Sequence, residues 1–139
     1  MEDAGRPVVY PTLRQVCDVN RRMVEEFGGF FVPPDNLHNH DALEYVLEAI
    51  GASVHGQPLH DTLKEKAAAL AHQIISRHVF HDGNKRTGVF VAWEFLRANG
   101  VKLDLDRSVV ELTVALATGN AAREELLQWL HAHQESQAP

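Results

Sequence analysis

Apolar residues recur along this chain at helical spacing, and the first such stripe lies near its amino-terminal end. Thr12 and Gln15 form a capping-box pattern there, and Gly28 follows as a stop signal. Residues three or four positions apart share one face of a helix. We therefore expect a first helix that begins at Thr12 and buries Leu13, Val16, Val19, Met23 and Phe27.

The same periodicity predicts five further helices and no clear strand. Thr62 and Glu65 repeat the capping-box pattern before the most regular stripe, which consists of Leu63, Ala67, Leu70, Ala71, Ile74 and Ile75. The expected ranges are residues 41–50, 62–77, 85–99, 106 or 108 to 118, and 120–129. Such a series predicts an all-α bundle in a single domain over residues 1–139, with a core at about 10–130 and frayed termini.

Composition and net charge exclude several classes of protein. A chain of 139 residues with 45% hydrophobic residues can bury its own core. The net charge of -6 argues against a protein that coats nucleic acid, and the single cysteine, Cys17, excludes an internal disulfide. No apolar run is long enough for a membrane span, and residues 1–6 do not resemble a signal peptide. We expect a cytoplasmic protein with no direct nucleic-acid or membrane partner.

The densest chemistry lies between the third and fourth expected helices, in residues 78–87. Gly83 and Asn84 tolerate positive φ and predict a sharp turn into a helix, whose first backbone N–H groups bind anions such as phosphate. Lys85 and Arg86 add two cations at this helix start. Cations there oppose the helix dipole, so an anion is expected to bind. Gly83, Asn84, Lys85 and Arg86 are the predicted nucleotide-phosphate site.

Two residues just before this turn complete the predicted chemistry. Asp82 offers a hard oxygen ligand that suits Mg²⁺ beside phosphate oxygens. His78 has the pKa range of a general base and could accept a hydroxyl proton. Together these residues indicate nucleotide-dependent group transfer. The simpler alternatives are helix caps at His78, Asp82 and Asn84, and solvated charges at Lys85 and Arg86.

Residues 78–87 read His-x-Phe-x-Asp-Gly-Asn-Lys-Arg-Thr, which resembles the signature of the Fic/Doc superfamily and of its death-on-curing (Doc) branch. The segments 62–70, 95–100 and 112–119 resemble the same branch, so the similarity covers about residues 10–129. This resemblance implies a compact Fic-fold helical bundle. It also implies a flap, possibly a β-hairpin, that aligns the target protein beside the active site. The flap would lie at about Ala52 to Pro58.

Two departures from the wider Fic pattern bear on the reaction. Typical Fic proteins carry Gly-Asn-Gly-Arg at this loop, whereas Lys85 replaces the second glycine here and Val89 stands where a second arginine is usual. Members that resemble this branch transfer the γ-phosphate of ATP, with Mg²⁺, to elongation factor Tu and halt translation. The resemblance therefore implies a toxin kinase with His78 as the base, Asp82 as the metal ligand, and Gly83, Asn84, Lys85 and Arg86 on the phosphates.

The resemblance also implies a cognate antitoxin that binds as a helix in a groove of the domain. The autoinhibitory Ser/Thr-x-x-x-Glu-Gly/Asn helix of some Fic proteins has no match in this sequence, which agrees with an inhibitor supplied by another chain. Two alternatives stay open: an AMP transferase of the Fic type, and a non-catalytic module that keeps the fold for partner binding.

Two further segments call for an interpretation. Residues 30–34 form an apolar stretch after the first helix, and we expect it to pack against the core rather than to form a docking patch. His38 and His40 could ligate a metal, but two histidines in a loop are more often solvated, and the wider pattern of a metal-dependent nuclease is absent from the sequence.

Overall fold

The computed structural model describes residues 7–54, 56–58, 62–102 and 123–132. These ranges contain a helical bundle and one short hairpin, in agreement with the predicted all-α class. The helices are α1 (Leu13–Phe27), α2 (His40–Ile50), α3 (Leu63–Ser76), α4 (Asn84–Ala98) and α6 (Arg123–Ala132), and the strands are β1 (Ser53–Val54) and β2 (Gln57–Pro58). The expected helix at 106–118 and both termini lie outside the described residues.

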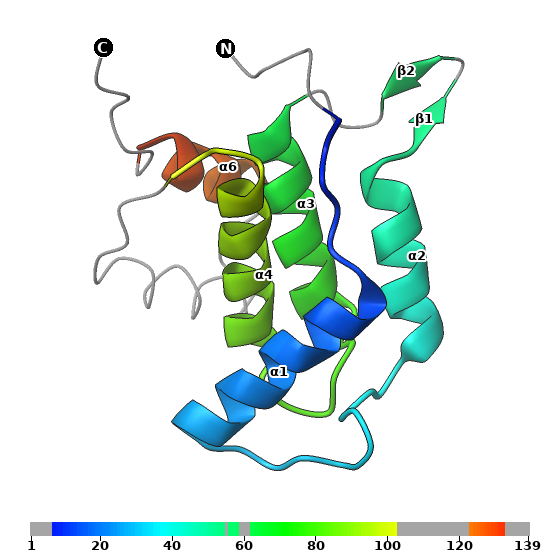
Figure 1. Ribbon diagram of the computed structural model, residues 1–139, viewed down its shortest axis with the longest axis vertical. Helices are drawn as coiled ribbons and strands as arrows, with labels where there is room; N and C mark the ends of the chain where they lie inside the picture. Colours follow the sequence, from blue (N-terminus) through cyan, green and yellow to red (C-terminus); the bar gives the residue numbers. More distant parts are fainter. Residues whose placement is uncertain (1–6, 55, 59–61, 103–122, 133–139) are drawn as a thin grey trace.

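Helix α3 lies in the middle of the bundle and packs against α2, α4 and α6, while α1 crosses the lower end of α4 and also contacts α2 (Figure 1). The apolar stripe predicted for α3 is fully confirmed, since each of its residues is at most 8% exposed: Leu63, Ala67, Leu70, Ala71, Ile74 and Ile75. The core therefore surrounds α3 on several sides.

The capping signals in the sequence place the helix starts correctly. Thr12 and Gln15 form the complete capping box at the start of α1, and Gly28 ends that helix. The Thr62 hydroxyl accepts a hydrogen bond of 3.1 Å from the Glu65 backbone N–H. Helix α2 begins one residue earlier than expected, because the Asn39 side chain accepts from the Ala42 N–H and caps it. Helix α4 also begins one residue early, at Asn84.

Helices α3 and α4 approach each other closely at Gly88. A Cβ atom on Gly88 would lie 2.9 Å from the Ala71 carbonyl oxygen and 2.9 Å from Ile75 Cγ1, so the contact leaves no room for a side chain. This packing brings the end of α3 and the start of α4 together, and residues 77–83 alone connect them.

The predicted hairpin exists, but it does not lie beside the predicted active loop. Strands β1 and β2 are antiparallel, with Ser53 opposite Pro58 and Val54 opposite Gln57. The hairpin precedes α3, whereas residues 77–83 follow it, and Figure 1 shows the two at opposite ends of the bundle. A helix of 14 residues spans roughly 20 Å. The expected position next to the active site is therefore wrong for this conformation.

Three apolar residues at the end of α1 and after it are more exposed than the sequence predicts. Phe27 is 47% exposed, although it was expected on the buried stripe of α1. Phe30 is 60% exposed and Val32 is 41% exposed, so the expected packing of residues 30–34 against the core is wrong for these two side chains. The reason is that α1 extends past the end of the core, and the segment after it lies over the α3–α4 loop.

Within the described ranges, no helix has the length and the apolar character that crossing a bilayer requires.

The close contact at Gly88 predicts a stability effect. Gly88→Val should lower the free energy of unfolding by about 1–3 kcal/mol, because the new side chain must push α3 and α4 apart. Denaturant-induced unfolding measures the change. Ser76→Ala, at an exposed position of α3, is the control and should stay within about 0.5 kcal/mol of wild type. Equal stability of Gly88→Val and wild type would contradict the close packing.

Candidate active site

Helix α3 ends in a Schellman motif, and His78 occupies its left-handed position. The His78 N–H bonds to the Ile75 carbonyl at 3.3 Å, and the Val79 N–H bonds to the Ile74 carbonyl at 3.4 Å. His78 has φ of 49°, in a conformation that glycine usually supplies at this place. Keeping a histidine there costs about 1–2 kcal/mol of backbone strain. A histidine thus stands where the backbone conformation favours glycine.

The His78 side chain is exposed. Within the described part of the chain, its imidazole makes no hydrogen bond or ion pair. A neutral imidazole has one unprotonated nitrogen, which can accept a proton. The geometry therefore permits the predicted role of general base at the carboxyl end of α3.

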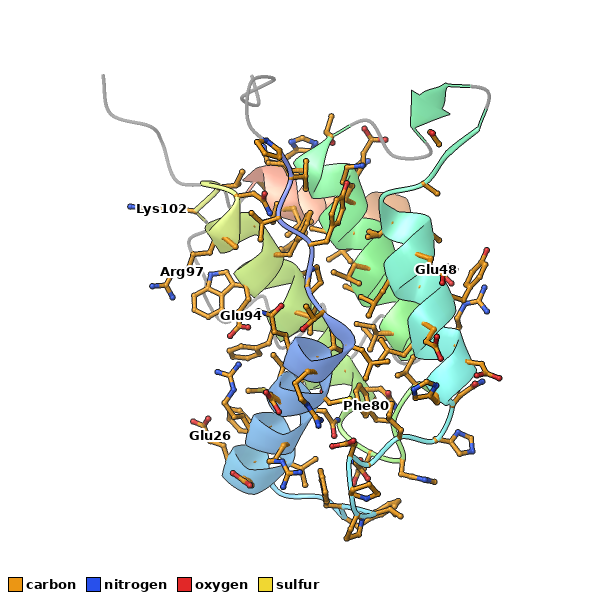
Figure 2. The ribbon with its side chains drawn as sticks, turned by 45° about the vertical axis from the view of Figure 1, so that its right-hand side comes forward. Glu26, Glu48, Phe80, Glu94, Arg97 and Lys102 are labelled. Carbon is orange, nitrogen blue, oxygen red and sulfur yellow. The ribbon has the colours of Figure 1, made fainter. Side chains whose placement is uncertain are left out.

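Phe80 anchors the loop to the core. Its side chain is 1% exposed and points into the lower end of the bundle (Figure 2), and its backbone forms a bridge with Leu37. The Asn84 side chain bonds to both backbone groups of Phe80 at 2.8 Å, its oxygen accepting from the N–H and its amide donating to the carbonyl. Asn84 thus clamps the loop with its side chain.

The Asp82 carboxylate is held by the segment that follows α1. We call residues 28–32 the strap. The Phe30 N–H donates to Asp82 Oδ2 at 3.0 Å, and the Gly83 N–H donates to Oδ1 at 2.8 Å. A Cβ atom on Gly29 would lie 2.6 Å from Oδ2, so the strap needs a glycine there. Each carboxylate oxygen has one donor and keeps acceptor capacity on its other side.

The start of α4 has the features of an anion site. Gly83 has φ of 79° and precedes the first helical residue, and no described side chain caps the helix. Thr87 is the first residue whose N–H bonds within the helix, to the Gly83 carbonyl at 2.9 Å. The N–H groups of residues 84–86 therefore have no partner within the helix. The simple alternative, in which the Asn84 side chain caps α4, is contradicted because Gly83 holds the cap position.

Two cations stand at this helix start, and one of them packs against α1. Lys85 and Arg86 are exposed. The Arg86 guanidinium carbon lies 4.4 Å from the centroid of the Phe27 ring. A cation over an aromatic face is attracted by the ring quadrupole, so Phe27 restricts the direction of Arg86. This contact accounts for the exposure of Phe27.

The groups at this loop and helix start suit a nucleoside triphosphate together with Mg²⁺. Free N–H groups and two cations suit phosphate oxygens. Mg²⁺ in such sites is held by one or two carboxylates together with the phosphates, which is what Asp82 offers. One continuous loop and helix start therefore carries all of the predicted site residues: His78, Asp82, Gly83, Asn84, Lys85 and Arg86.

His38, which precedes α2, and His40, the first residue of α2, take separate places. His38 lies 5.0 Å from His81, ring to ring, and its Nδ1 is 3.3 Å from the His78 carbonyl oxygen. His40 instead pairs with Glu44 at 2.8 Å on α2. His38 and His40 therefore do not form a joint metal site within the described residues, although His40, Asp41 and Glu44 come within 4.8 Å of one another at an exposed position.

Sequence reasoning missed the groups that support the loop from outside. The sequence indicates only that Gly28 ends α1. In the structure the backbone of Gly29 lies against the Asp82 carboxylate, and the Phe30 N–H donates to it. Asn20 and Asn36, both fully buried, were not singled out. Asn20 falls on the apolar face of α1, and a polar residue on such a face is the signal that could have revealed it.

Comparisons with known proteins agree with the loop motif. The model of the Fic/DOC family matches residues 10–96. The chain is 45% identical over 83 residues to Toxin Doc of Mycolicibacterium smegmatis, covering 60% of this chain and 61% of that protein. It is 48% identical over 42 residues to Protein kinase doc of Escherichia phage P1, covering 30% of this chain and 33% of that protein. The matches thus span about three fifths and one third of these relatives.

The strained position of His78 predicts an unusual stability effect. His78→Gly should raise the free energy of unfolding by about 0.5–1 kcal/mol, because glycine removes the left-handed strain and loses part of that gain to chain entropy. His78→Ala keeps the strain and should not show this gain. Denaturant titration of both variants measures these changes. A His78→Gly protein that is no more stable than His78→Ala would contradict the left-handed backbone conformation of His78.

Proposed function

Because the chain belongs to the Fic/DOC family, we propose that it is a toxin with protein kinase activity. It transfers the γ-phosphate of ATP to a Ser or Thr hydroxyl of a translation factor, elongation factor Tu, and thereby arrests translation. The observation that carries the proposal is the joining of three groups on one short loop: an exposed histidine in a strained turn, a carboxylate held by the strap, and an uncapped helix start with two cations. The names of the two relatives, a toxin and a protein kinase, support both parts.

The residues of the loop divide the work of the reaction. His78 accepts the proton of the target hydroxyl as its oxygen forms a bond to the γ-phosphorus. The bond from that phosphorus to the bridging oxygen breaks, and ADP leaves. The N–H groups of residues 84–86, with Lys85 and Arg86, stabilise the charge on the phosphate oxygens. Asp82 would hold Mg²⁺, which would supply further neutralisation of phosphate charge.

Lys85 favours transfer of the γ-phosphate over transfer of AMP. Its exposed side chain stands in the first turn of α4, where typical Fic proteins have a glycine. Glycine lets the backbone approach phosphates closely, whereas lysine fills that space and adds a charge. We infer a nucleotide pose in which the γ-phosphate faces the acceptor. This inference rests on the resemblance of the motif and on the position of Lys85.

The first test is induced expression in a bacterial host, with wild type beside His78→Ala. Growth arrest and a phosphate adduct on elongation factor Tu, detected by mass spectrometry, are expected for wild type. Both should be lost in His78→Ala, which removes the base and leaves the exposed loop otherwise intact. A fully toxic His78→Ala protein would contradict the assignment. An AMP adduct, or label from α-labelled rather than γ-labelled ATP, would indicate an AMP transferase.

A second test addresses Lys85. Lys85→Gly should lower the rate of γ-phosphate transfer by roughly 10- to 100-fold, because a cation that stabilises the transferring group is removed. The measurement is transfer of label from γ-labelled ATP to elongation factor Tu. Lys102→Gly is the matched control, since Lys102 is also exposed and lies beyond the far end of α4 (Figure 2). Equal rates for both variants would refute the role of Lys85.

The proposed toxin also requires an antitoxin, and one groove suits a helix from such a partner. It has a volume of about 560 Å³ and lies between residues 9–11, α1 and α4. Its floor is apolar, formed by Val16, Val19, Val91 and Phe95, and its rim is charged, formed by Asp18, Arg22 and Glu94. An apolar floor with a polar rim fits the apolar face of an amphipathic helix. We propose that the antitoxin binds here.

A surface substitution in the groove tests this partner. Val9 is 56% exposed and its backbone is fixed by two hydrogen bonds to the Asn99 side chain, so Val9→Asp should leave the fold intact. The variant should stay toxic, while co-expression of the antitoxin no longer restores growth. Tyr45→Asp, at an exposed position of α2 outside the groove, is the control and should still be neutralised. Full neutralisation of Val9→Asp would place the antitoxin elsewhere.

A further inference from the structure

Three buried polar side chains gather beneath the active loop. Among the described residues, the polar or charged side chains that are buried are Asn20, Asn36, Lys66 and Thr87. Asn20, Asn36 and Thr87 are 0% exposed and belong to one hydrogen-bonded cluster. Burying an amide is costly unless its groups are bonded, so such a cluster persists only with nearly complete pairing.

Asn20 reaches from α1 to both sides of the turn into α4. Its amide nitrogen donates to the Asp82 carbonyl at 2.8 Å and to the Thr87 hydroxyl at 3.1 Å. The two N–H bonds of one amide are thus both used. The carbonyl belongs to the residue that offers the metal ligand, and the hydroxyl lies in the first turn of the helix that receives the phosphates.

Asn36 completes the pairing from the segment between α1 and α2. Its amide nitrogen donates to Asn20 Oδ1 at 3.0 Å and to the Asp82 carbonyl at 3.3 Å. Its side-chain oxygen accepts from the Val32 N–H at 2.9 Å, and its backbone carbonyl accepts from the His81 N–H at 2.9 Å. Asn36 therefore joins the strap, Asn20 and the active loop.

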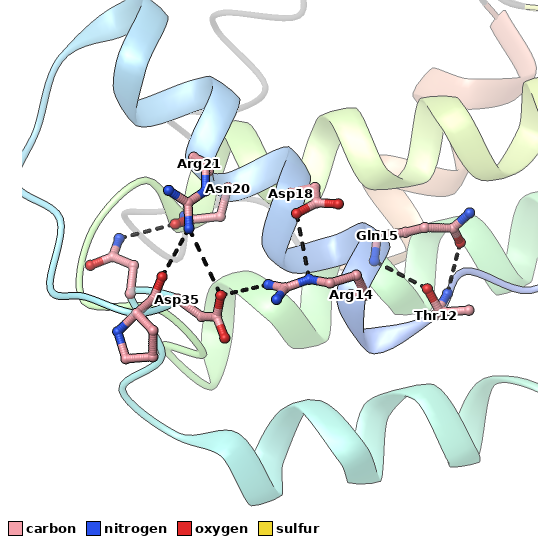
Figure 3. A network of polar contacts seen from close by, with 9 residues as sticks. Thr12, Arg14, Gln15, Asp18, Asn20, Arg21 and Asp35 are labelled. Carbon is pink, nitrogen blue, oxygen red and sulfur yellow. Dashed lines mark hydrogen bonds and ion pairs between the residues drawn. The ribbon is translucent and has the colours of Figure 1, made fainter.

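The segment that carries Asn36 is itself fixed to α1 by charges. Figure 3 shows Arg14 and Arg21 directed at Asp35. Arg14 Nη2 lies 2.6 Å from Asp35 Oδ1, and Arg21 donates to the Pro34 carbonyl at 2.9 Å. The hydrogen bond to Asp35 raises the pKa of Arg14 above its ordinary value. Asn36 is thus presented by an anchored segment.

The two asparagines of the cluster, Asn20 and Asn36, fix the peptide that joins Asp82 to Gly83. With the Asp82 carbonyl held by two amides, the orientation of that peptide is set, and its N–H points at Asp82 Oδ1. Gly83 also lies directly on α1, since a Cβ atom there would be 3.1 Å from Asn20 Nδ2 and 3.2 Å from Val24 Cγ2. The direction of the carboxylate and of the first free N–H groups of α4 follows from this one peptide.

We propose that Asn20, supported by Asn36, is a positioning residue for phosphoryl transfer. It holds the peptide between Asp82 and Gly83 so that the metal ligand and the phosphate donors point at one place. Neither asparagine touches substrate, since both are fully buried. This inference rests on the proposed function, because it names what orients the same site. A displacement of about 1 Å at such a site can lower the rate by about 100-fold.

Three variants separate positioning from stability. Asn20→Asp keeps the shape of the side chain and removes both donors. Asn36→Gly removes the second donor to the Asp82 carbonyl. Because Asn36 has φ of 60°, glycine suits the backbone conformation there, so this variant should fold even where Asn20→Asp does not. Thr87→Val is the matched control, since it deprives Asn20 of its other partner and leaves the bond to Asp82.

The measurement is the rate of transfer per folded molecule to elongation factor Tu, with Tm and the Mg²⁺ concentration for half-maximal rate. Roughly 10- to 100-fold lower kcat and a raised Mg²⁺ requirement are expected for Asn20→Asp and Asn36→Gly. Thr87→Val should have a lower Tm but keep kcat within about threefold of wild type, as expected for a hydrogen bond that contributes only to the stability of the fold. Equal kcat in all three variants, corrected for folded fraction, would overturn the inference while the proposed function stands.

A second readout does not depend on activity. Amide NMR resonances and hydrogen exchange of residues 83–85 should change in Asn20→Asp and Asn36→Gly and stay near wild type in Thr87→Val. If wild type transfers no label from ATP, the proposed function fails. These amide signals then decide by themselves whether Asn20 and Asn36 orient the loop. Loop signals that change equally in all three variants would then overturn it.

Discussion

The close packing of α3 against α4 is the constraint on which the rest of the molecule depends. Gly88 lies against the Ala71 carbonyl and Ile75 without room for a Cβ atom, and the small residues of α3 line the contact. In this structure residues 77–83 alone connect these two helices. The connection uses left-handed conformations at both ends, at His78 and at Gly83. The candidate active site therefore lies on the connection between these two helices.

The tight connection alone does not fix the orientation of the loop. Contacts with residues outside the loop fix it. Phe80 fixes the loop to the core, and the Asn84 side chain closes it on itself. Helix α1 and the segment after it then cover the loop, with the strap on the Asp82 carboxylate and two asparagines on the Asp82 carbonyl. Backbone and amide donors suit this task because they direct an acidic residue without adding a competing charge. Phe27 does the same for Arg86 through its ring.

The predictions that failed share a physical cause. Phe27, Phe30 and the hairpin were assigned from local pattern or from the resemblance, and each depends on what lies opposite in space. Phe27 continues the apolar stripe of α1, but the core ends before it, so its ring meets Arg86 instead. Phe30 is apolar, yet its backbone rather than its side chain has the contact that matters. The hairpin forms as expected, but α3 separates it from the active loop.

The sequence by itself determined the approximate ranges of the described helices, the caps at Thr12 and Thr62 and the candidate residues of the α3–α4 loop. Helix starts at Thr12 and Thr62, the buried face of α3 and the sharp turn at Gly83 all arise from interactions among residues a few positions apart. Only the tertiary structure decided which distant groups hold that loop. Asn20, Gly29 and Asn36 meet Asp82 across 46 to 62 positions of the chain. No periodic pattern records such contacts, because they arise only when α1 packs across the start of α4.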